Sequence, residues 1–318
     1  MLVTGAAGFI GSNLIEFFLS NGFKVKGIDN FETGSEGNIE SALTNSKKIS
    51  GAEFNFIEGD IRNFKDCVEC TRDVDVVFHE AALGSVQRSI DKPLQSNETN
   101  VGGTLNLLKA SIDNRVKRFI YASSSSVYGD SEVLPKNEDM IPNPKSIYAV
   151  SKLASEYYVR LFYKIYGLET VSLRYFNVFG GRQSPDSVYS AVIPLFLKNF
   201  KLNKPLTVYG DGNQSRDFTY IDNVVYANFL AMTGGNNKIF GNFYNVGCGR
   251  QIRLNEIINF LEEEKGRKIE VDYKEPRTGD VKDSLASLEK ICSDLGYRPL
   301  IDFYEGIENL IKLTFNNC

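Results

Sequence analysis

A glycine-rich turn near the N-terminus restricts the possible folds more than any other feature of this chain. A short apolar strand over residues 1–4 leads into Gly5-Ala6-Ala7-Gly8-Phe9-Ile10-Gly11, after which we expect a helix over 12–20. Glycines at this spacing permit a tight turn and let the backbone approach a pyrophosphate, and the helix N-terminus supplies N–H donors. The pattern predicts a dinucleotide-binding unit whose loop contacts are Gly5, Gly8, Phe9, Ile10 and Gly11.

The next strand indicates which dinucleotide is bound. Residues 24–29 read as a strand that ends at Asp29. A carboxylate in this position accepts a hydrogen bond from the ribose 2′-OH and repels a 2′-phosphate. Asn30 and Phe31 follow, and no arginine stands beside them to bind that phosphate. We therefore predict NAD rather than NADP.

Strand and helix patterns alternate through the first half of the chain. Further apolar strands are expected at 54–58, 74–79, 119–122 and 170–175, with helices over 97–114 and 148–166. Strands alternating with helices favour a parallel sheet covered on both faces. We predict an α/β fold, a Rossmann-type doubly wound parallel sheet. The proline-rich segment 130–146 is expected to be irregular.

The alternation stops after residue 175, where proline and glycine recur. A helix over 224–232 and a strand over 241–246 are expected to return to the first sheet. We therefore predict two interleaved domains. Residues 1–175 and about 217–248 form the NAD-binding domain, and about 176–216 with 249–318 form a smaller substrate domain.

Hydroxyl groups and a Tyr-Lys pair form a candidate catalytic site. The run Ser123–Ser126 follows the strand 119–122, and ligands of open α/β sheets bind beyond such strand ends. Tyr148 and Lys152 are four positions apart on an expected helix, so they share one face. A nearby ammonium favours the phenolate of a tyrosine. The pair is therefore predicted to act as a general base.

Composition excludes several other classes of protein. The 318 residues carry a net charge of −4, without the basic surface that nucleic acid requires. No apolar run is long enough to span a membrane, and we expect a cytoplasmic protein. Cys67 and Cys70 are expected to be helix residues without a metal or redox role, because His79 is the only histidine and no second cysteine pair exists.

Together these motifs resemble the extended branch of the short-chain dehydrogenase/reductase superfamily. The resemblance spans nearly the whole chain, includes the segments 173–177, 216–218 and 277–281, and is greatest to UDP-hexose 4-epimerases. Within these it is greatest to the subgroup acting on UDP-N-acetylglucosamine and UDP-N-acetylgalactosamine. It implies a transient 4-keto sugar, bound NAD and a homodimer. The helix 148–166, apolar on more than one face, is expected to form the dimer's helix bundle.

The resemblance also implies residue roles. Tyr148 takes the proton of the sugar 4-hydroxyl, Ser124 binds that hydroxyl, and Lys152 binds the nicotinamide ribose and lowers the pKa of Tyr148. Further cofactor contacts are implied at Asp29, Asn30, Asp60, Ile61, Ala81, Ala82, Asn100 and Tyr175, with Asn100 holding Lys152 or a water. Further substrate contacts are implied at Gly84, Ser85, Ser125, Ser126, Asn177, Gln183, Ala191, Val192, Val208, Tyr209, Arg216, Arg277, Asp280 and Ser284.

Two positions bear on the identity of the sugar. Relatives that exclude an N-acetyl group carry a bulky residue where this chain has Ser284, and galactose epimerases often carry Asn where it has Ala191. Both differences imply a roomier pocket. Sugar 4,6-dehydratases need an acid pair where Ser125 and Ser126 stand, and UDP-glucuronate decarboxylases usually carry Glu at 126. A uronic-acid 4-epimerase and an inactive, NAD-sensing regulatory protein are the remaining alternatives.

Overall fold

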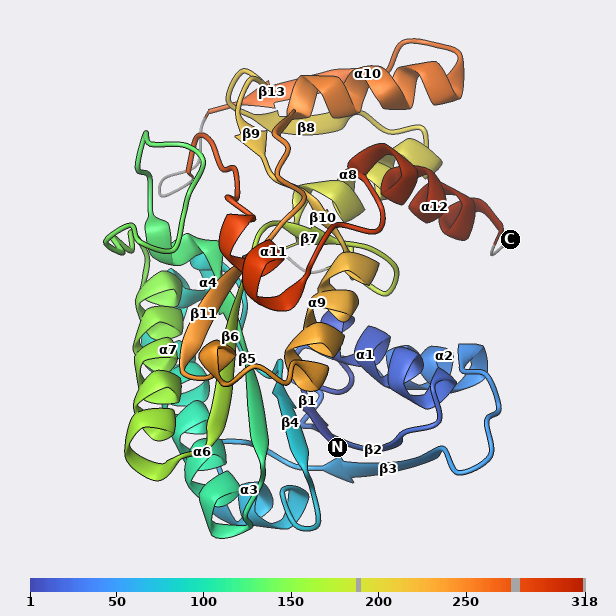
Figure 1. Ribbon diagram of the computed structural model, residues 1–318. Coiled ribbons are helices and arrows are strands. Elements are labelled where there is room, and N and C mark those ends of the chain that lie inside the picture. Colours follow the sequence, from blue (N-terminus) through green and yellow to red (C-terminus); the bar gives the residue numbers. More distant parts are fainter. Residues whose placement is uncertain (187–189, 276–280, 317–318) are drawn as a thin grey trace.

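A seven-stranded parallel sheet forms the centre of the computed structural model, which describes residues 1–186, 190–275 and 281–316 (Figure 1). The strand order is β11-β6-β5-β4-β1-β2-β3. The strands are β1 (Leu2–Thr4), β2 (Lys24–Asp29), β3 (Glu53–Glu58), β4 (Val76–His79), β5 (Arg118–Ser124), β6 (Glu169–Tyr175) and β11 (Asn242–Val246). Helices cover both faces, which confirms the predicted Rossmann-type fold.

Different helices cover the two faces of the sheet. On one face lie α1 (Phe9–Ser20), α2 (Glu36–Asn45) and α9 (Ile221–Thr233), and on the other lie α3 (Phe64–Cys70), α6 (Gly103–Asp113) and α7 (Ile147–Tyr166) (Figure 1). Strand β1 pairs with β4 on one side and β2 on the other, so the chain leaves it in two directions. Such a reversal opens a crevice at the carboxyl ends of the strands.

Two predicted helix boundaries were wrong. Helix α1 begins at Phe9 rather than Ser12, because Gly8 is extended and its carbonyl already accepts a bond from the Ser12 N–H at 3.1 Å. The helix expected over 97–114 is preceded by α5 (Pro93–Asn97) and a π-helical turn over Glu98–Gly102. This turn buries Asn100 beneath the site.

Helix α7 agrees with its prediction because its ends are specified locally. The Ser146 hydroxyl accepts a bond from the Ala149 N–H at 3.1 Å, and Gly167 ends the helix with a φ of 74°. A serine N-cap and a left-handed glycine are favourable helix ends. These ends fix where Tyr148 and Lys152 lie relative to β5.

The rest of the chain forms a second layer of structure above the carboxyl ends of the sheet (Figure 1). Its main elements are α8 (Val192–Lys201), β8 (Leu206–Tyr209), α10 (Leu254–Lys265), β13 (Val271–Lys274) and α12 (Phe303–Asn316). Helix α11 (Glu289–Leu295) packs against β11 instead. Short pieces elsewhere in the chain are α4 (Val86–Asp91), β7 (Val178–Phe179), β9 (Ser215–Arg216), β10 (Thr219–Tyr220), β12 (Ile252–Arg253) and the 3₁₀ turns 125–128 and 237–239. The predicted domain boundaries remain a prediction.

One hydrophobic core connects the two regions. It joins sheet residues such as Ile120 and Val171 to Phe196 of α8 and Leu261 of α10. Within the part of the chain described here, no helix combines the length and apolar character needed to cross a membrane.

Cys67 and Cys70 lie buried in α3, as predicted for helix residues. Burial raises the pKa of both thiols, to about 12 for Cys70. The thiols are therefore protonated at neutral pH. Among the described residues, no group of three His, Cys, Asp or Glu side chains could hold a metal ion.

Candidate active site

The predicted catalytic side chains meet at the end of β5. Ser124 is the last residue of that strand, and its hydroxyl is hydrogen-bonded to the Tyr148 phenol. The Lys152 ammonium donates to the Ala122 carbonyl at 2.8 Å. The Tyr148 N–H donates to the Ser89 hydroxyl at 3.0 Å, which ties the start of α7 to α4. The fold thus brings one hydroxyl, one phenol and one ammonium together.

The serines of the run lie in two environments. Ser126 donates from both its N–H and its hydroxyl to the Ser124 hydroxyl, at 3.2 and 2.9 Å, from the 3₁₀ turn that begins at Ser125. The Ser123 hydroxyl instead donates to Glu156 at 2.7 Å, in the protein interior. Successive side chains of a strand point to opposite faces, so Ser123 and Ser124 at the end of β5 point in opposite directions. Ser124–Ser126 face the site, and Ser123 supports it from below.

The glycine loop packs closely against neighbouring backbone, which requires glycine at these positions. Gly5 has a φ of +66°, and a side chain there would approach the Ala81 N–H to 2.9 Å. A Cβ on Gly11 would lie only 2.1 Å from the Gly5 carbonyl oxygen. Beside the loop, the Asp29 carboxylate accepts bonds from the N–H groups of Ala7 and Phe31 at 2.9 and 2.8 Å. These residues fit a dinucleotide.

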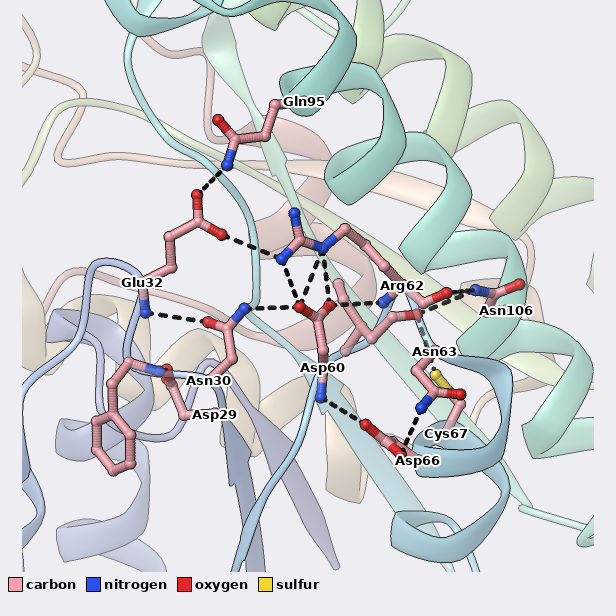
Figure 2. A network of polar contacts seen from close by, with 12 residues as sticks. Asp29, Asn30, Glu32, Asp60, Arg62, Asn63, Asp66, Cys67, Gln95 and Asn106 are labelled. Carbon is pink, nitrogen blue, oxygen red and sulfur yellow. Dashed lines mark hydrogen bonds and ion pairs between the residues drawn. The ribbon is translucent and has the colours of Figure 1, made fainter.

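A polar network joins the ends of β2 and β3, and Figure 2 shows Asp60 at its centre. Asp60 accepts from Asn30 at 2.8 Å and from the Arg62 guanidinium. Glu32 accepts from Arg62 at 3.4 Å and from the Gln95 amide at 2.5 Å. We call these five residues the β2–β3 network. No arginine directly follows Asp29 in the sequence, but Arg62, in the loop after β3, reaches this end of the sheet.

A second polar network lies at the ends of β4, β5 and β6. The Tyr175 hydroxyl donates to the Glu80 carboxylate at 2.9 Å and accepts from the Asn228 amide at 2.8 Å. We call Glu80, Ser124, Tyr148, Lys152 and Tyr175 the β4–β6 network.

A cavity of about 370 Å³ lies in the second layer. Five predicted substrate residues line it: Asn177, Ala191, Val192, Tyr209 and Arg216. Residues that were not predicted also line it, among them Gln214, Phe218 and Lys274. A larger, open depression of 490 Å³ on α3 includes no candidate site residue, so the smaller cavity is the better substrate site.

A protein-family model described as the NAD dependent epimerase/dehydratase family matches residues 1–247. The chain belongs to this family. A putative UDP-glucose 4-epimerase of Methanocaldococcus jannaschii is 36% identical over 100% of this chain and 99% of its own length. A UDP-glucuronate 4-epimerase of Thermodesulfobacterium geofontis is 34% identical, covering 99% of this chain and 96% of its own length.

Solved structures agree with this epimerase-family assignment. The UDP-N-acetylglucosamine 4-epimerase from Methanobrevibacter ruminantium in complex with UDP-N-acetylmuramic acid superposes with a TM-score of 0.91 at 34% identity, covering 100% and 98% of the two chains. The UDP-glucuronic acid 4-epimerase from Bacillus cereus in complex with UDP-glucuronic acid and NAD gives 0.90 at 35%, covering 100% and 99%. NAD is the cofactor of the family and of this chain.

Burial dominates the electrostatics of the Tyr-Lys pair in this epimerase-family chain. It raises the pKa of Tyr148, and the hydrogen bond with Ser124 only partly opposes that shift. Burial also lowers the pKa of Lys152 to about 8, although Glu80 acts to raise it. The protein groups around Tyr148 thus raise its pKa on balance, and the predicted lowering by Lys152 together with the positive charge of the nicotinamide stays a prediction.

Several predicted residues lie elsewhere than expected. Asn100 bonds to Leu83 and to the Ser151 hydroxyl rather than to Lys152, because the π-helical turn directs it there. Val208 is buried in the core, since strand alternation turns Thr207 and Tyr209 to the cavity instead. The Val208 side chain therefore does not line the cavity, and the predicted contact of Val208 with the substrate stays a prediction.

The remaining residues that were predicted to contact cofactor or substrate lie in several different parts of the structure. Ser85 caps α4, Gly84 precedes it, and the Gln183 amide donates to the Val178 carbonyl at 3.3 Å. Ile61 packs in the core against Gly103, and the Ala81 N–H donates to the Thr4 hydroxyl at 3.1 Å, next to Ala82. Arg277 and Asp280 lie outside the described residues.

Sequence reasoning missed Glu80, Glu32, Arg62 and Gln95. Glu80 directly follows an expected strand, so its place at the sheet edge was a usable signal. The other three come from separate segments, and only the strand order brings them together.

Proposed function

We propose that this isomerase, an NAD-dependent UDP-sugar 4-epimerase, interconverts UDP-N-acetylglucosamine and UDP-N-acetylgalactosamine. The observation that carries the sugar assignment is the place of Ser284. Its hydroxyl donates to the Asn177 amide oxygen at 3.4 Å and accepts from the Asp217 N–H at 3.3 Å. Asn177 lines the cavity, and a small residue bonded to it keeps the bulk of a larger side chain away from this wall, which supports an N-acetylated sugar as substrate.

The proposed chemistry uses the residues at the end of β5. Tyr148 takes the proton of the sugar 4-hydroxyl, and Ser124, held by Ser126, positions that hydroxyl. Bound NAD supplies the acceptor, and then the donor, of the hydride at C4. Lys152 holds a positive charge beside the phenol. After the 4-keto sugar turns over and its other face is reduced, Tyr148 returns the proton to the C4 oxygen.

Arginine and tyrosine side chains in the cavity suit the rest of the substrate. Arg216 provides a permanently charged group for the diphosphate. Tyr209 provides an aromatic surface for the uracil. In this proposal the reacting sugar lies toward Ser124 and the nucleotide lies in the second layer.

The direct test is incubation of the purified protein, without added reductant, with UDP-N-acetylglucosamine, UDP-glucose and UDP-glucuronate in separate tubes. Products are identified by proton NMR. We expect conversion of the acetylated sugar to its 4-epimer. Conversion of UDP-glucuronate alone would contradict the proposed substrate while leaving the epimerase class intact.

A substitution tests the pocket. Ser284→Tyr is expected to lower turnover of UDP-N-acetylglucosamine far more than turnover of UDP-glucose, because the phenol fills the space beside Asn177. Ser284→Ala, which keeps the space, is the matched control. Equal losses on both sugars in the tyrosine variant would remove Ser284 as the determinant.

UDP-glucuronate 4-epimerisation is the second candidate. Relatives of nearly equal similarity carry that name, in Thermodesulfobacterium geofontis and Bacillus cereus. The glucuronate arm of the NMR experiment decides between the two.

We also propose that the protein is a homodimer through α7. Leu161 and Ile165 are 45% and 65% exposed on that helix, and Tyr157 is exposed one turn earlier. Adjacent exposed apolar side chains mark an interaction surface. Light scattering is expected to give twice the chain mass, and Leu161→Glu with Ile165→Glu to give monomers. A wild-type monomer would contradict the proposal.

A further inference from the structure

The turn after β2 is the place where NAD and NADP differ for this protein. Asp29 ends β2, and a carboxylate in that position accepts a hydrogen bond from the ribose 2′-OH of NAD. NADP carries a phosphate on the same oxygen, and an arginine nearby accommodates that phosphate. The fold brings Arg62 to this turn from the loop after β3. The choice of dinucleotide therefore depends on what holds Arg62.

The Arg62 guanidinium lies between two carboxylates. Its Nε donates to both oxygens of Asp60 at 3.0 Å, and its Nη2 donates to one of them at 2.5 Å. The same Nη2 contacts the Glu32 carboxylate at 3.4 Å, and Figure 2 shows Glu32 on one side of the guanidinium and Asp60 on the other. Asp60 alone satisfies the charge of Arg62, so Glu32 is a second, surplus carboxylate on the same cation.

Glu32 is itself held in place by its neighbours. The Gln95 amide, from α5, donates to its carboxylate at 2.5 Å. The Glu32 N–H donates to the Asn30 amide oxygen at 3.1 Å, and the Asn30 amide group donates to Asp60 at 2.8 Å. These bonds join the turn after β2 to the loop after β3. They keep the Glu32 carboxylate directed at Arg62.

Arg62 keeps donors that its two carboxylate partners do not use. Its bonds engage Nε and Nη2, and among the described residues Nη1 has no hydrogen-bond partner. The side chain is 27% exposed, so the guanidinium is not sealed in the interior. A guanidinium is a planar fork of N–H donors that matches the geometry of a phosphate. Arg62 thus has the chemistry of a phosphate ligand but is bound to carboxylates.

The balance of charge at this turn opposes a phosphate. Asp29, Glu32 and Asp60 carry three negative charges beside the one positive charge of Arg62. A phosphate monoester adds roughly −1.5 to −2 charges at neutral pH, whereas the 2′-OH of NAD adds none. Like charges at short distance repel each other. Removal of Glu32 would both lower this repulsion and release one side of Arg62.

We propose that Glu32 is a specificity residue for the dinucleotide: it holds the Arg62 guanidinium against Asp60 and adds a negative charge, so that the 2′-phosphate of NADP meets no available cation. Glu32 acts through Arg62 and needs no contact of its own with the cofactor. The proposal rests on the predicted contact of Asp29 with the ribose 2′-OH. It goes beyond the proposed epimerisation, because neither the sugar nor Tyr148 takes part in it.

The test is a competition between the two dinucleotides. The purified protein is incubated with equal concentrations of NAD and NADP until the ratio of bound nucleotides is constant. Free nucleotide is removed by gel filtration, and bound nucleotide is released by denaturation and quantified by ion-exchange chromatography. Glu32→Gln, which keeps an oxygen acceptor for Gln95 but removes the charge, is expected to raise the bound NADP:NAD ratio about fivefold. An unchanged ratio would overturn the proposal.

Two further variants show whether Arg62 is the cation that Glu32 restrains. Glu32→Gln combined with Arg62→Gln should return the ratio to the wild-type value, because the phosphate then has no guanidinium to bind. Glu53→Gln is the matched control, since Glu53 is an exposed carboxylate paired with Lys24 at the other end of β3, and it should leave the ratio unchanged. A gain that persists without Arg62, or an equal gain in the control, would overturn the proposal.

An Asp29→Asn background makes small changes in the ratio measurable. This substitution keeps an oxygen acceptor for the Ala7 and Phe31 N–H groups but removes the charge that favours NAD. Glu32→Gln should raise the ratio further in this background, and no further rise would contradict a separate role for Glu32. Gln95→Ala, which removes the donor that braces Glu32, should raise the ratio in the same direction if Glu32→Gln does not fold. The measurement needs no UDP-sugar, so its outcome is independent of the proposed substrate.

Discussion

The β2–β3 network and the β4–β6 network stand at the same edge of one sheet but treat charge in opposite ways. In the first, the Arg62 and Asp60 side chains are 27% and 26% exposed, and each has several partners. In the second, Lys152 is buried and Glu80 has an oxygen without a partner. The charged atoms of the second network are more deeply buried than those of the first.

The pKa shifts follow from this difference. Burial raises the pKa of Asp60, but the bonds from Arg62 outweigh it, so the net pKa is lowered and the pair stays charged. In the β4–β6 network burial prevails. It raises the pKa of Glu80 to about 7 and lowers the pKa of Lys152 to about 8. Satisfied, half-exposed charges can hold a nucleotide at any physiological pH. Buried charges that titrate near neutrality can move protons.

The largest effect should come from removing the proton acceptor of the buried network. Tyr148→Phe is expected to lower kcat by roughly 10²–10⁴-fold, the contribution of a positioned general base. NAD should remain bound, as measured by its release on denaturation. Tyr166→Phe, at the exposed end of the same helix, should keep wild-type turnover. Substantial activity in Tyr148→Phe would mean that another group is the base.

An ion pair beneath the buried network gives the next largest effect. Arg174 and Glu156 are bonded at 2.7 and 3.0 Å, and each side chain is 1% exposed. Glu156→Ala leaves the guanidinium buried without its partner and should lower the free energy of unfolding by about 3–5 kcal/mol. Urea unfolding measures it. A loss below about 1 kcal/mol would show that water reaches this site after all.

His79 provides a pH test of burial, because it is the only histidine in the chain. Burial, and to a smaller extent Lys152, lower its pKa from 6.5 to about 3. Between these values the unfolded state binds more protons than the native state, so stability falls as pH falls. From about pH 8 to about pH 5, wild type should lose about 2 kcal/mol more than His79→Gln. Parallel pH dependences would contradict a buried, neutral imidazole.

The smallest effect is expected in the β2–β3 network. Glu32→Gln removes the 3.4 Å ion pair with Arg62, whose partner Asp60 remains. Because these side chains are partly exposed, the free energy of unfolding should change by about 0–1 kcal/mol. Urea unfolding measures this change in the free energy of unfolding as well. A loss comparable to that of Glu156→Ala would remove the distinction between the two networks.

Local sequence spacing predicted part of both networks. Asp29 follows a strand and the glycine loop, and Tyr148 and Lys152 share a helix face, so these positions follow from secondary structure and a parallel sheet. Ser124 was predictable for the same reason. The hydroxyl run alone did not separate Ser123, which points into the interior, from Ser124, because that depends on strand parity.

The rest depends on strand order and on side-chain direction. Glu80 and Tyr175 are 95 positions apart and meet only because β5 lies between their strands. Glu32, Arg62 and Gln95 come from three segments that the sheet and α5 bring together. The Val208 side chain lies on the core face of β8, one step of strand alternation from Tyr209, and a resemblance to a binding loop does not reveal that direction.

The most direct measurement follows deuterium at the reacting carbon. A UDP-sugar substrate labelled with deuterium at C4 is converted in ordinary water, and the product is examined by proton NMR. If the buried β4–β6 network carries out oxidation and reduction within one closed site, the 4-epimer should keep its deuterium at C4 through many turnovers. Replacement of that deuterium by solvent hydrogen would contradict the central claim.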